Sequence, residues 1–566
     1  MIEKTQEKKL AKFLAVGVFL ISVTVMTEGF ADPVNVPKFL ILGVVALGSL
    51  GFLIRSQAVP FFFREVSKNA PLFLFLIFSL ITTLKSSLPL SQNLYGSYGR
   101  NNGFFTYLFL SVIFICGSLM ATRSNHSTLL KSLIYVGYVN LAYCLWVIIL
   151  GDFVPWDNPY GNILGTFGNP NFIGAFLGIF FGVLLSFALG KEASKAFKIS
   201  LIVILPLTIF EIVDSSAIQG RVLAALSIAI VGFFYVRFKL KPVYTVFYST
   251  TMIAIGVLAL AGALQRGPLT EWIYKTSVSL RGQYWLAAWN TGQTNPRYGV
   301  GMDGFGDWYR RSRDIRAIEL PGTNTVVNAA HNVPLDMFAF GGWPLFISYL
   351  LVMALSFKSA VVIARRIRSY DAVAVGLITA WACYQLQSII SINQIGLAVW
   401  GWLLSGLLIG YEKHLKRLED ADIPALRSTN KTRAVERSLD AKNVLWVSAL
   451  GGIGLLIALP PATADIKMRS AQVSQDAFKV EQTMDSSYFN PQNIQKYALN
   501  IQVFENSGLF DLSHKYTLQA IKWNPETYDF WRILYSIKNS TQEERDLAIQ
   551  KMRVLDPLNP ELRSTR

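Results

Sequence analysis

Apolar runs of close to twenty residues recur along this 566-residue chain, and they constrain its fold more strongly than any other feature. A run of roughly 20 residues can cross the hydrocarbon core of a bilayer as a helix. Backbone polar groups inside a bilayer must be satisfied within each segment, and the alternation of β-barrel strands is absent, so we expect helices. The runs lie at residues 13–30, 38–54, 70–84, 103–120, 130–150, 171–190, 199–213, 221–236, 243–264, 333–357, 372–392, 396–411 and 443–461. The sequence therefore predicts an all-α, polytopic integral membrane protein with about 12 to 13 transmembrane helices.

The composition agrees with a membrane protein and argues against a nucleic-acid partner. Hydrophobic residues make up 52% of the chain, charged residues only 16%, and the mean hydropathy is +0.38. The net charge of +16 follows from basic cytoplasmic segments and basic outer domains, so nucleic-acid binding is not needed to explain it. Cys116, Cys144 and Cys383 all fall inside apolar runs, which indicates packing rather than a disulfide framework or a thiolate metal site.

The distribution of Lys and Arg predicts the orientation of the chain. Basic residues concentrate in 190–198, 237–241 and 357–371, segments that face the same side as the N-terminus. The short loops on the other side contain only Lys38, Lys85, Arg100 and Arg221. Basic loops stay in the cytoplasm, so the N-terminus is expected there. An odd number of spans then places the C-terminus outside.

Polar segments divide the chain into four parts. Residues 1–264 form the first set of transmembrane helices, and residues 265–332 form a long external loop, hereafter the long loop. Residues 333–461 contain the remaining spans and a solvated cytoplasmic linker at 412–442, whose basic start can touch anionic lipids. Residues 465–566 form a polar, external helical domain, hereafter the C-terminal domain.

The C-terminal domain contains a weak internal repeat. The segment Ala-Ile-Lys-Trp-Asn-Pro ending at Pro525 is echoed by Ala548-Ile549 and by Leu-Asp-Pro ending at Pro557. Helical hairpins of the tetratricopeptide type repeat at about this interval. The sequence thus favours a small tetratricopeptide-like domain, which could bind a protein partner, over an irregular helical tail.

His331 is the candidate catalytic base. The chain has four histidines; His126 and His414 fall on segments expected in the cytoplasm, and His514 belongs to the C-terminal domain. His331 lies at the outer end of the span that begins near residue 333, where a neutral imidazole could accept a proton from a hydroxyl near neutral pH. The alternative is that His331 caps this helix.

Three arginines near the same outer level are candidate ligands of a phosphate or diphosphate. Arg281 lies four residues before Trp285, so the two share one face of a helix, with Ser279 just before them. Arg221 begins one span and Arg100 precedes another. A guanidinium donates paired N–H groups to phosphate oxygens. The alternative is that each arginine anchors lipid headgroups or pairs with Glu271 or Asp303.

Two glycine-rich motifs lie near the ends of spans. In Gly165-Thr-Phe-Gly-Asn169-Pro-Asn171, an asparagine N-cap with free N–H groups facing outward is expected. The motif from Pro296 to Gly306 looks like a phosphate-binding loop, but no strand precedes it, so a tight turn that positions the long loop is expected instead.

Taken in order, these motifs resemble the O-antigen ligase and O-antigen polymerase family of membrane glycan transferases. The matching segments are 32–38, 96–103, 165–171, 216–221, the Ser279, Arg281 and Trp285 trio, 299–305, and His331-Asn332 followed by Gly341-Gly342. They cover nearly the whole membrane region, and some members of the family also have a C-terminal helical-repeat domain.

The resemblance implies a glycosyltransferase in the bacterial cytoplasmic membrane, inverting and independent of metals and cofactors. Its donor would be an undecaprenyl-diphosphate-linked glycan, held on the outer face by Arg221 and Arg281, with Arg100 as a third contact. His331 would be the general base for an acceptor hydroxyl on a lipid, a glycan or a protein, and Ser279, Trp285, Asn332, Asn169 and Asn171 would support the site. The resemblance is compatible with ligation, polymerisation and protein glycosylation, and it does not distinguish these three reactions.

Two classes of non-enzyme remain as alternatives. About thirteen spans would also suit a transporter or flippase of lipid-linked glycans, but such proteins contain internal repeats and helices broken near the bilayer midplane. A scaffolding protein would use the C-terminal domain and would not need an Arg and His cluster. The conspicuous polar groups of this chain lie at the ends of spans, which favours the enzyme.

Overall fold

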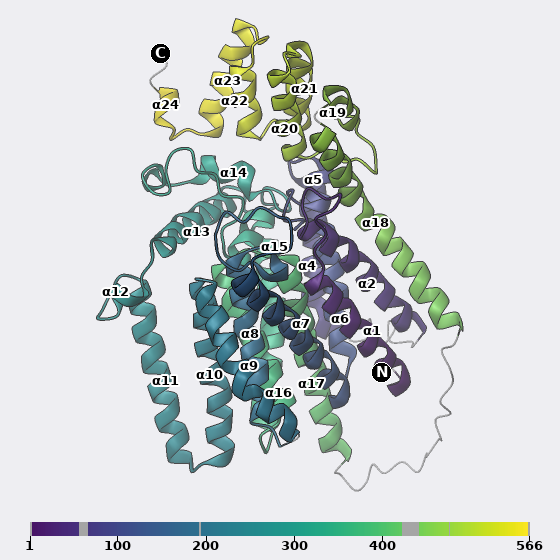
Figure 1. The fold of residues 1–566 in the computed structure, drawn as a ribbon, viewed down its shortest axis with the longest axis vertical. Helices are drawn as coiled ribbons and strands as arrows, with labels where there is room; N and C mark the ends of the chain where they lie inside the picture. Colours follow the sequence, from purple (N-terminus) through teal and green to yellow (C-terminus); the bar gives the residue numbers. More distant parts are fainter. Residues whose placement is uncertain (1–2, 56–65, 192–193, 422–440, 475, 564–566) are drawn as a thin grey trace.

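The computed structural model describes residues 3–55, 66–191, 194–421, 441–474 and 476–563, and every apolar run forms a helix. The helices are α1 (Lys4–Val23), α2 (Asn35–Arg55), α4 (Val66–Lys85), α6 (Phe104–Leu119), α7 (Arg123–Leu150), α8 (Pro170–Ala188), α9 (Lys195–Asp214), α10 (Ile218–Lys239), α11 (Pro242–Ala263), α15 (Val333–Arg366), α16 (Ala372–Ile390), α17 (Ile395–Ala421) and α18 (Ala441–Ser474). The helices run side by side as one bundle (Figure 1). The expected all-helical architecture is thus present.

Ten of these helices in the described chain are long and apolar enough to cross a membrane. The other three are α1, α4 and α6. The apolar described parts of α4 and α6, Asn69–Lys85 and Phe104–Leu119, are shorter, and α1 carries Glu7, Lys8 and Lys9 in its first half. Length and composition therefore support ten spans where the sequence predicts 12 to 13.

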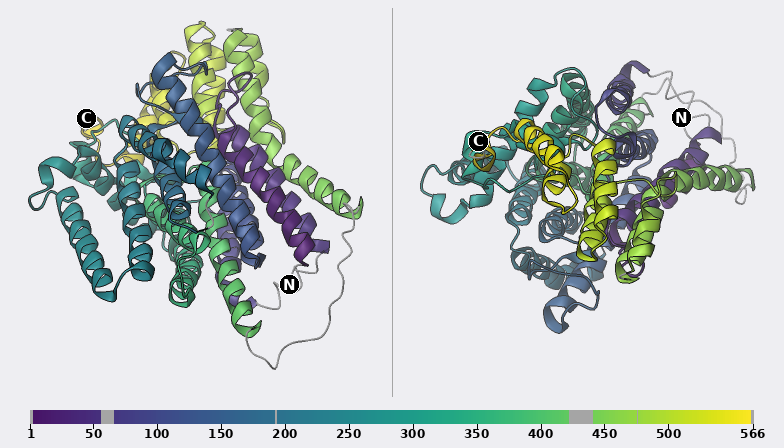
Figure 2. Two further views of the ribbon diagram at one scale, coloured as in Figure 1. Left: turned by 60° about the horizontal axis from the view of Figure 1, so that its bottom comes forward. Right: turned by 90° about the horizontal axis from the view of Figure 1, so that it is seen from above.

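Glycines allow the last long helix to lie directly against the second. Helix α18 packs along α2 on one flank of the bundle (Figure 2). A side-chain carbon on Gly43 would lie 2.7 Å from the carbonyl oxygen of Gly454, and one on Gly454 would lie 2.1 Å from that of Gly43. Small residues permit such close approach of helices, which is how helices associate in lipid.

Several predicted boundaries differ from the structure. The first apolar run, 13–30, is helical only as far as Val23, where α1 ends. Helix α17 continues to Ala421, into the segment expected to be a solvated linker, and its Glu412 accepts a hydrogen bond from the Ser359 hydroxyl at 2.7 Å and pairs with Lys416. Residues 422–440 of that linker lie outside the described residues. Helix α18 runs to Ser474 without a break at 465, and its Asp465 accepts hydrogen bonds from the backbone N–H groups of Ala31 and Asp32, in the loop before α2.

Much of the long loop is helical. It contains α12 (Thr270–Ile273), α13 (Thr276–Thr294), α14 (Phe305–Ser312) and the short 3-10 helix η2 (Ile315–Ile318). Helix α13 packs against α15 and α14. The long loop and the C-terminal domain lie at the same end of the bundle (Figure 1).

The C-terminal domain consists of short helices around a core of its own. They are α19 (Ala477–Thr483), α20 (Ile494–Asn506), α21 (Phe510–Trp523), α22 (Tyr528–Ser536), α23 (Gln542–Leu555) and α24 (Pro560–Arg563). The pairs α20–α21 and α22–α23 form two consecutive hairpins, packed around buried residues that include Phe504, Ala520 and Phe530. Seen from above, these helices lie over the bundle rather than beside it (Figure 2).

A buried ion-pair cluster joins the C-terminal domain to the long loop. Arg310 and Arg313 both donate to Asp556, at 3.1 and 2.6 Å, and all three side chains are at most 5% exposed. Both arginines also donate to the carbonyl oxygen of Thr323. The segment between α14 and residue 323 is therefore tied to the end of α23.

Candidate functional site

Arg281 lies on α13, on a partly buried face that leaves its guanidinium without a partner. Tyr284, one helical turn further on, is buried where α13 packs against α15. Arg281 is half-buried, and no described residue accepts a hydrogen bond from it or pairs with its charge. Burial lowers the pKa of Arg281, and only Tyr284 opposes this shift. A cation in such surroundings favours an anionic ligand.

His331 lies next to this arginine, immediately before α15. Its ring lies against the ring of Tyr284, with the two centroids 5.6 Å apart, and its nitrogens have no hydrogen-bond partner among the described residues. Burial lowers the pKa of His331 to about 4, and the charges of Arg281 and Arg100 add to the shift. The imidazole is therefore neutral near neutral pH, the state that a general base requires.

The backbone of His331 is in the left-handed region, with φ of 54°. A residue other than glycine is uncommon there, and such conformations cluster at functional sites. His331 does not cap α15, because Asn332 is the N-cap and accepts a hydrogen bond from the N–H of Leu335 at 3.0 Å. The capping alternative for His331 is thus wrong, and Asn332 begins the helix beside it.

Arg100 faces the same site but is already paired. It forms a buried ion pair with Asp303, the partner that the anchoring alternative names. Asp303 also accepts a hydrogen bond from the N–H of Ser97 at 2.7 Å, so the two loops are held together. The charge of Arg100 reaches His331. A role of Arg100 as a third diphosphate contact stays a prediction, while its ion pair favours a positioning role.

Arg221 lies on another helix, α10. It is exposed in the first turn of α10, and α10 packs against α8 and α16, whereas α13 packs against α15 and α14. Among the described residues Arg221 forms no ion pair, and its charge does not contribute to the pKa shift of His331. The structure thus brings together Arg281, His331 and Arg100, and it gives Arg221 no polar contact with them.

The remaining predicted residues have local partners. The hydroxyl of Ser279 shares a hydrogen bond of 2.9 Å with that of Tyr274, and the buried indole N–H of Trp285 has no partner among the described residues. Asn169 is the N-cap of α8, as its motif predicts, and accepts from the N–H of Asn171 at 2.9 Å. The carbonyl of Asn171 accepts from the side chain of Gln219, which links the starts of α8 and α10.

The glycine-rich turn packs against a break in α15. Helical dihedrals are interrupted at Gly341 and Gly342, and Gly301 donates to the carbonyl of Phe340 at 3.0 Å. Gly299, with φ of 62°, leaves no room for a side chain, because its carbon would lie 2.1 Å from the oxygen of Phe340. The turn thus fixes the short first part of α15, which carries the site.

Asp336 and Tyr284 belong to the site but were not among the residues singled out from the sequence. Asp336 is buried in the first turn of α15, accepts from the N–H of Ala330 at 2.8 Å, and interacts electrostatically with Arg100. Asp336 follows His331 by five residues, and Tyr284 follows Arg281 by three. This short spacing from the candidate residues is the sequence feature that could have indicated both. In the part of the chain that the structure describes, no three His, Cys, Asp or Glu side chains gather where they could hold a metal ion.

No protein-family model matches the chain, and a search of curated proteins finds no similar sequence.

Proposed function

We propose that this protein is a membrane glycosyltransferase of the O-antigen ligase or polymerase type. It would transfer a glycan from an undecaprenyl-diphosphate donor to a hydroxyl of an acceptor. The observation that carries the proposal is the proximity of the half-buried guanidinium of Arg281, which has no partner among the described residues, to a neutral histidine, His331, with Tyr284 interacting with both. An anion site next to a free base suits a reaction that releases a diphosphate and consumes a hydroxyl proton.

The two residues have complementary roles in the transfer. The acceptor oxygen attacks the anomeric carbon, a new glycosidic bond forms, and the bond from that carbon to the diphosphate oxygen breaks. The hydroxyl proton passes to the free ring nitrogen of His331. The electron pair of the broken bond leaves with the lipid diphosphate, whose developing charge Arg281 stabilises. Attack from the face opposite the leaving group inverts the anomeric centre.

The site would lie on the outer face of the bacterial cytoplasmic membrane. Helices α1, α4 and α6 would complete the expected 12 to 13 spans, with the N-terminus in the cytoplasm and the C-terminus outside. The basic ends of α10 and α15 support this orientation. The acceptor would be a lipid, a glycan or a protein, which corresponds to ligation, polymerisation or protein glycosylation.

A transfer assay with purified protein in liposomes tests the proposal. The donor is an undecaprenyl-diphosphate-linked glycan extracted from the same cell envelope, and membrane lipids, glycan and envelope protein serve as acceptors. We expect a new glycosidic bond of inverted configuration and release of the lipid diphosphate, both lost in His331→Asn. Movement of the intact donor across the bilayer without any new bond would instead identify a flippase.

A further inference from the structure

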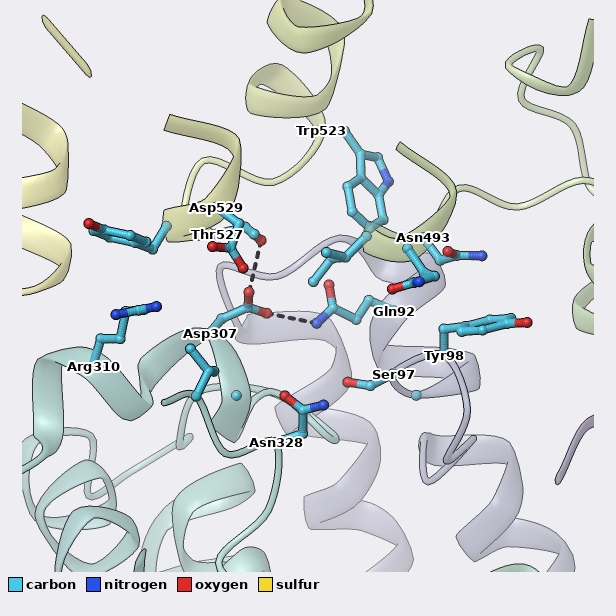
Figure 3. A pocket seen from close by; sticks show the side chains of 16 residues that line it. Gln92, Ser97, Tyr98, Asp307, Arg310, Asn328, Asn493, Trp523, Thr527 and Asp529 are labelled. Carbon is cyan, nitrogen blue, oxygen red and sulfur yellow. Dashed lines mark hydrogen bonds between the residues drawn. The ribbon is translucent and has the colours of Figure 1, made fainter. Parts of the chain in front are cut away.

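A half-open cavity of about 150 Å³ lies between the C-terminal domain and the helical bundle. Its lower wall is formed by the start of α14 and by the loop near Ser97, and its upper wall by the ends of α21 and α22 (Figure 3). Asp307 at its centre accepts hydrogen bonds from Gln92 and Thr527, each at 2.8 Å. The carboxylate thus connects the two walls of the cavity and fixes the distance between them.

The cavity is lined by flat polar side chains and aromatic rings. The lining contains the amides of Asn328 and Asn493 and the aromatic rings of Trp523 and Tyr98 (Figure 3). It also contains the carboxylate of Asp529, which pairs with Arg532, and the oxygen of Asn493 accepts the capping hydrogen bond of α20. The amide of Asn328 is exposed and makes no hydrogen bond with any described residue. Amides and carboxylates can each bond to two neighbouring hydroxyls, and an aromatic face packs against the C–H face of a sugar ring.

The charges of the lining argue against a phosphate ligand. Arg310 is the cavity's one basic side chain among the described residues, and it is committed to Asp556 and to the ring of Tyr528, 4.3 Å away. Asp307 and Asp529 add negative charge. A lipid chain is also a poor fit, because Val326 and Ile494 are the only aliphatic side chains of the described lining. The ligand class that fits this lining is therefore an uncharged molecule that is rich in hydroxyl groups.

The cavity adjoins the candidate site through two short segments. Asn328 precedes His331 by three residues, and Ser97 precedes Arg100 by three. The hydroxyl of Ser97 donates to the carbonyl of Asp303 at 3.0 Å, and Asp303 is the ion-pair partner of Arg100. A ligand in the cavity therefore lies along the same two segments that place Arg100 and His331.

We propose that this cavity is a carbohydrate-binding subsite that holds a sugar unit of the glycan chain while its anomeric end lies at Arg281 and His331. This inference deepens the proposed function and rests on it. The C-terminal domain then contributes directly to substrate binding, through Trp523, Asn493 and Asp529, rather than serving only as a docking module for other proteins.

Two binding measurements on the full-length protein in nanodiscs test the subsite. The first probe is the free oligosaccharide released by mild acid from the cell's own lipid-diphosphate-linked glycans, and the second is inorganic pyrophosphate. We expect Asn328→Ala and Trp523→Ala each to weaken oligosaccharide binding by about tenfold or more, with pyrophosphate binding unchanged. Asn324→Ala and Trp272→Ala, exposed residues of the long loop outside the cavity lining, are the matched controls and should bind both probes normally.

The outcomes separate the subsite from the proposed function. No saturable binding of the oligosaccharide to the wild type, or equal binding by Asn328→Ala, would overturn the subsite. Trp523 packs beside Tyr497, so its variant could disturb the domain; Asn328 has no such contact and keeps the test decisive. If pyrophosphate fails to bind while oligosaccharide binding still depends on Asn328, the proposed transferase fails and the sugar subsite stands.

Discussion

His331 and Arg281 show how burial changes the properties of single residues. An isolated histidine has a pKa of about 6.5, but burial and two nearby guanidinium groups lower the pKa of His331 to about 4. The helix dipole of α15 is not needed for this shift, since His331 precedes the N-cap. The same burial that lowers the pKa of Arg281 strengthens its attraction for a bound anion.

Replacement of His331 separates catalysis from structure. Asparagine tolerates the left-handed backbone of this position but cannot act as a base, so His331→Asn should fold normally and lose about 10²- to 10⁴-fold in turnover. Donor binding should persist. The control is Asn332→Ala, which removes the cap of α15 and should lower stability by about 1 kcal/mol. Turnover and melting temperature measured on both variants check this, and near-normal turnover in His331→Asn would exclude the general base.

Arg281→Lys tests whether the guanidinium or only its charge matters. Loss of the charge-assisted contact should cost about 1.5 to 3 kcal/mol of donor affinity. Lysine keeps the charge but loses the paired N–H donors, so Arg281→Lys should recover only part of that affinity. Arg266→Lys, an exposed position in the long loop, is the control and should bind the donor normally. Titration of pyrophosphate or donor lipid into each variant measures the effect. If Arg281→Lys bound the donor with wild-type affinity, Arg281 would serve only as an anchor for lipid headgroups.

The pKa of His331 should depend on whether the donor is bound. In the free protein the base is lost as the pH falls through its pKa of about 4. A bound diphosphate offsets the charges of Arg281 and Arg100, so the pKa should rise in the complex. The acidic limb of kcat/KM, which reports the free enzyme, should therefore lie at lower pH than the limb of kcat. Limbs in the reverse order would contradict the proposed placement of the diphosphate.

At the scale of elements, the long loop depends on its neighbours for its shape. The turn near Gly299 donates backbone hydrogen bonds to the residues just before the break in α15. Arginines in and just after α14 form ion pairs with Asp556, at the end of α23. Both contacts flank the segment that ends at His331. The position of His331 is therefore set by elements that are far from it in the sequence.

Asp556→Asn should loosen the C-terminal domain. The change leaves Arg310 and Arg313 buried without a charge partner, and breaking a buried pair costs about 3 to 5 kcal/mol. We expect a lower melting temperature and faster proteolysis between α14 and the C-terminal domain. The control Asp314→Asn breaks an exposed pair with Arg316 and should change little. Equal stability of the two variants would show that the Asp556 cluster does not hold the domain.

At the scale of the whole molecule, the two ends of the chain lie at opposite ends of the bundle (Figure 1). The start of α1 lies away from the C-terminal domain, and α18 connects the two ends. The cluster of Arg281 and His331 belongs to the same end as the C-terminal domain, because α13 and α15 meet there. Orientation in the membrane therefore decides which compartment supplies the acceptor.

Cysteine labelling of intact cells tests the orientation. The native cysteines Cys116, Cys144 and Cys383 are all buried, so background labelling should be low. An impermeant thiol reagent should label Glu543→Cys in the C-terminal domain but not Lys241→Cys between α10 and α11, two exposed positions. Lysis should expose the second position. The opposite pattern would invert the topology and place the site in the cytoplasm.

The membrane helices and the Asn169 cap could be predicted from the sequence because their causes are local. Apolar length alone predicts a helix able to cross a membrane, as in α8 or α16, and an asparagine before a proline caps the next helix. The neighbours of each charged group were decided only by the tertiary structure. Arg100 and Arg281 look alike in the sequence, yet the fold pairs Arg100 with Asp303 and gives Arg281 no charge partner among the described residues, because pairing depends on which side chains distant segments bring together.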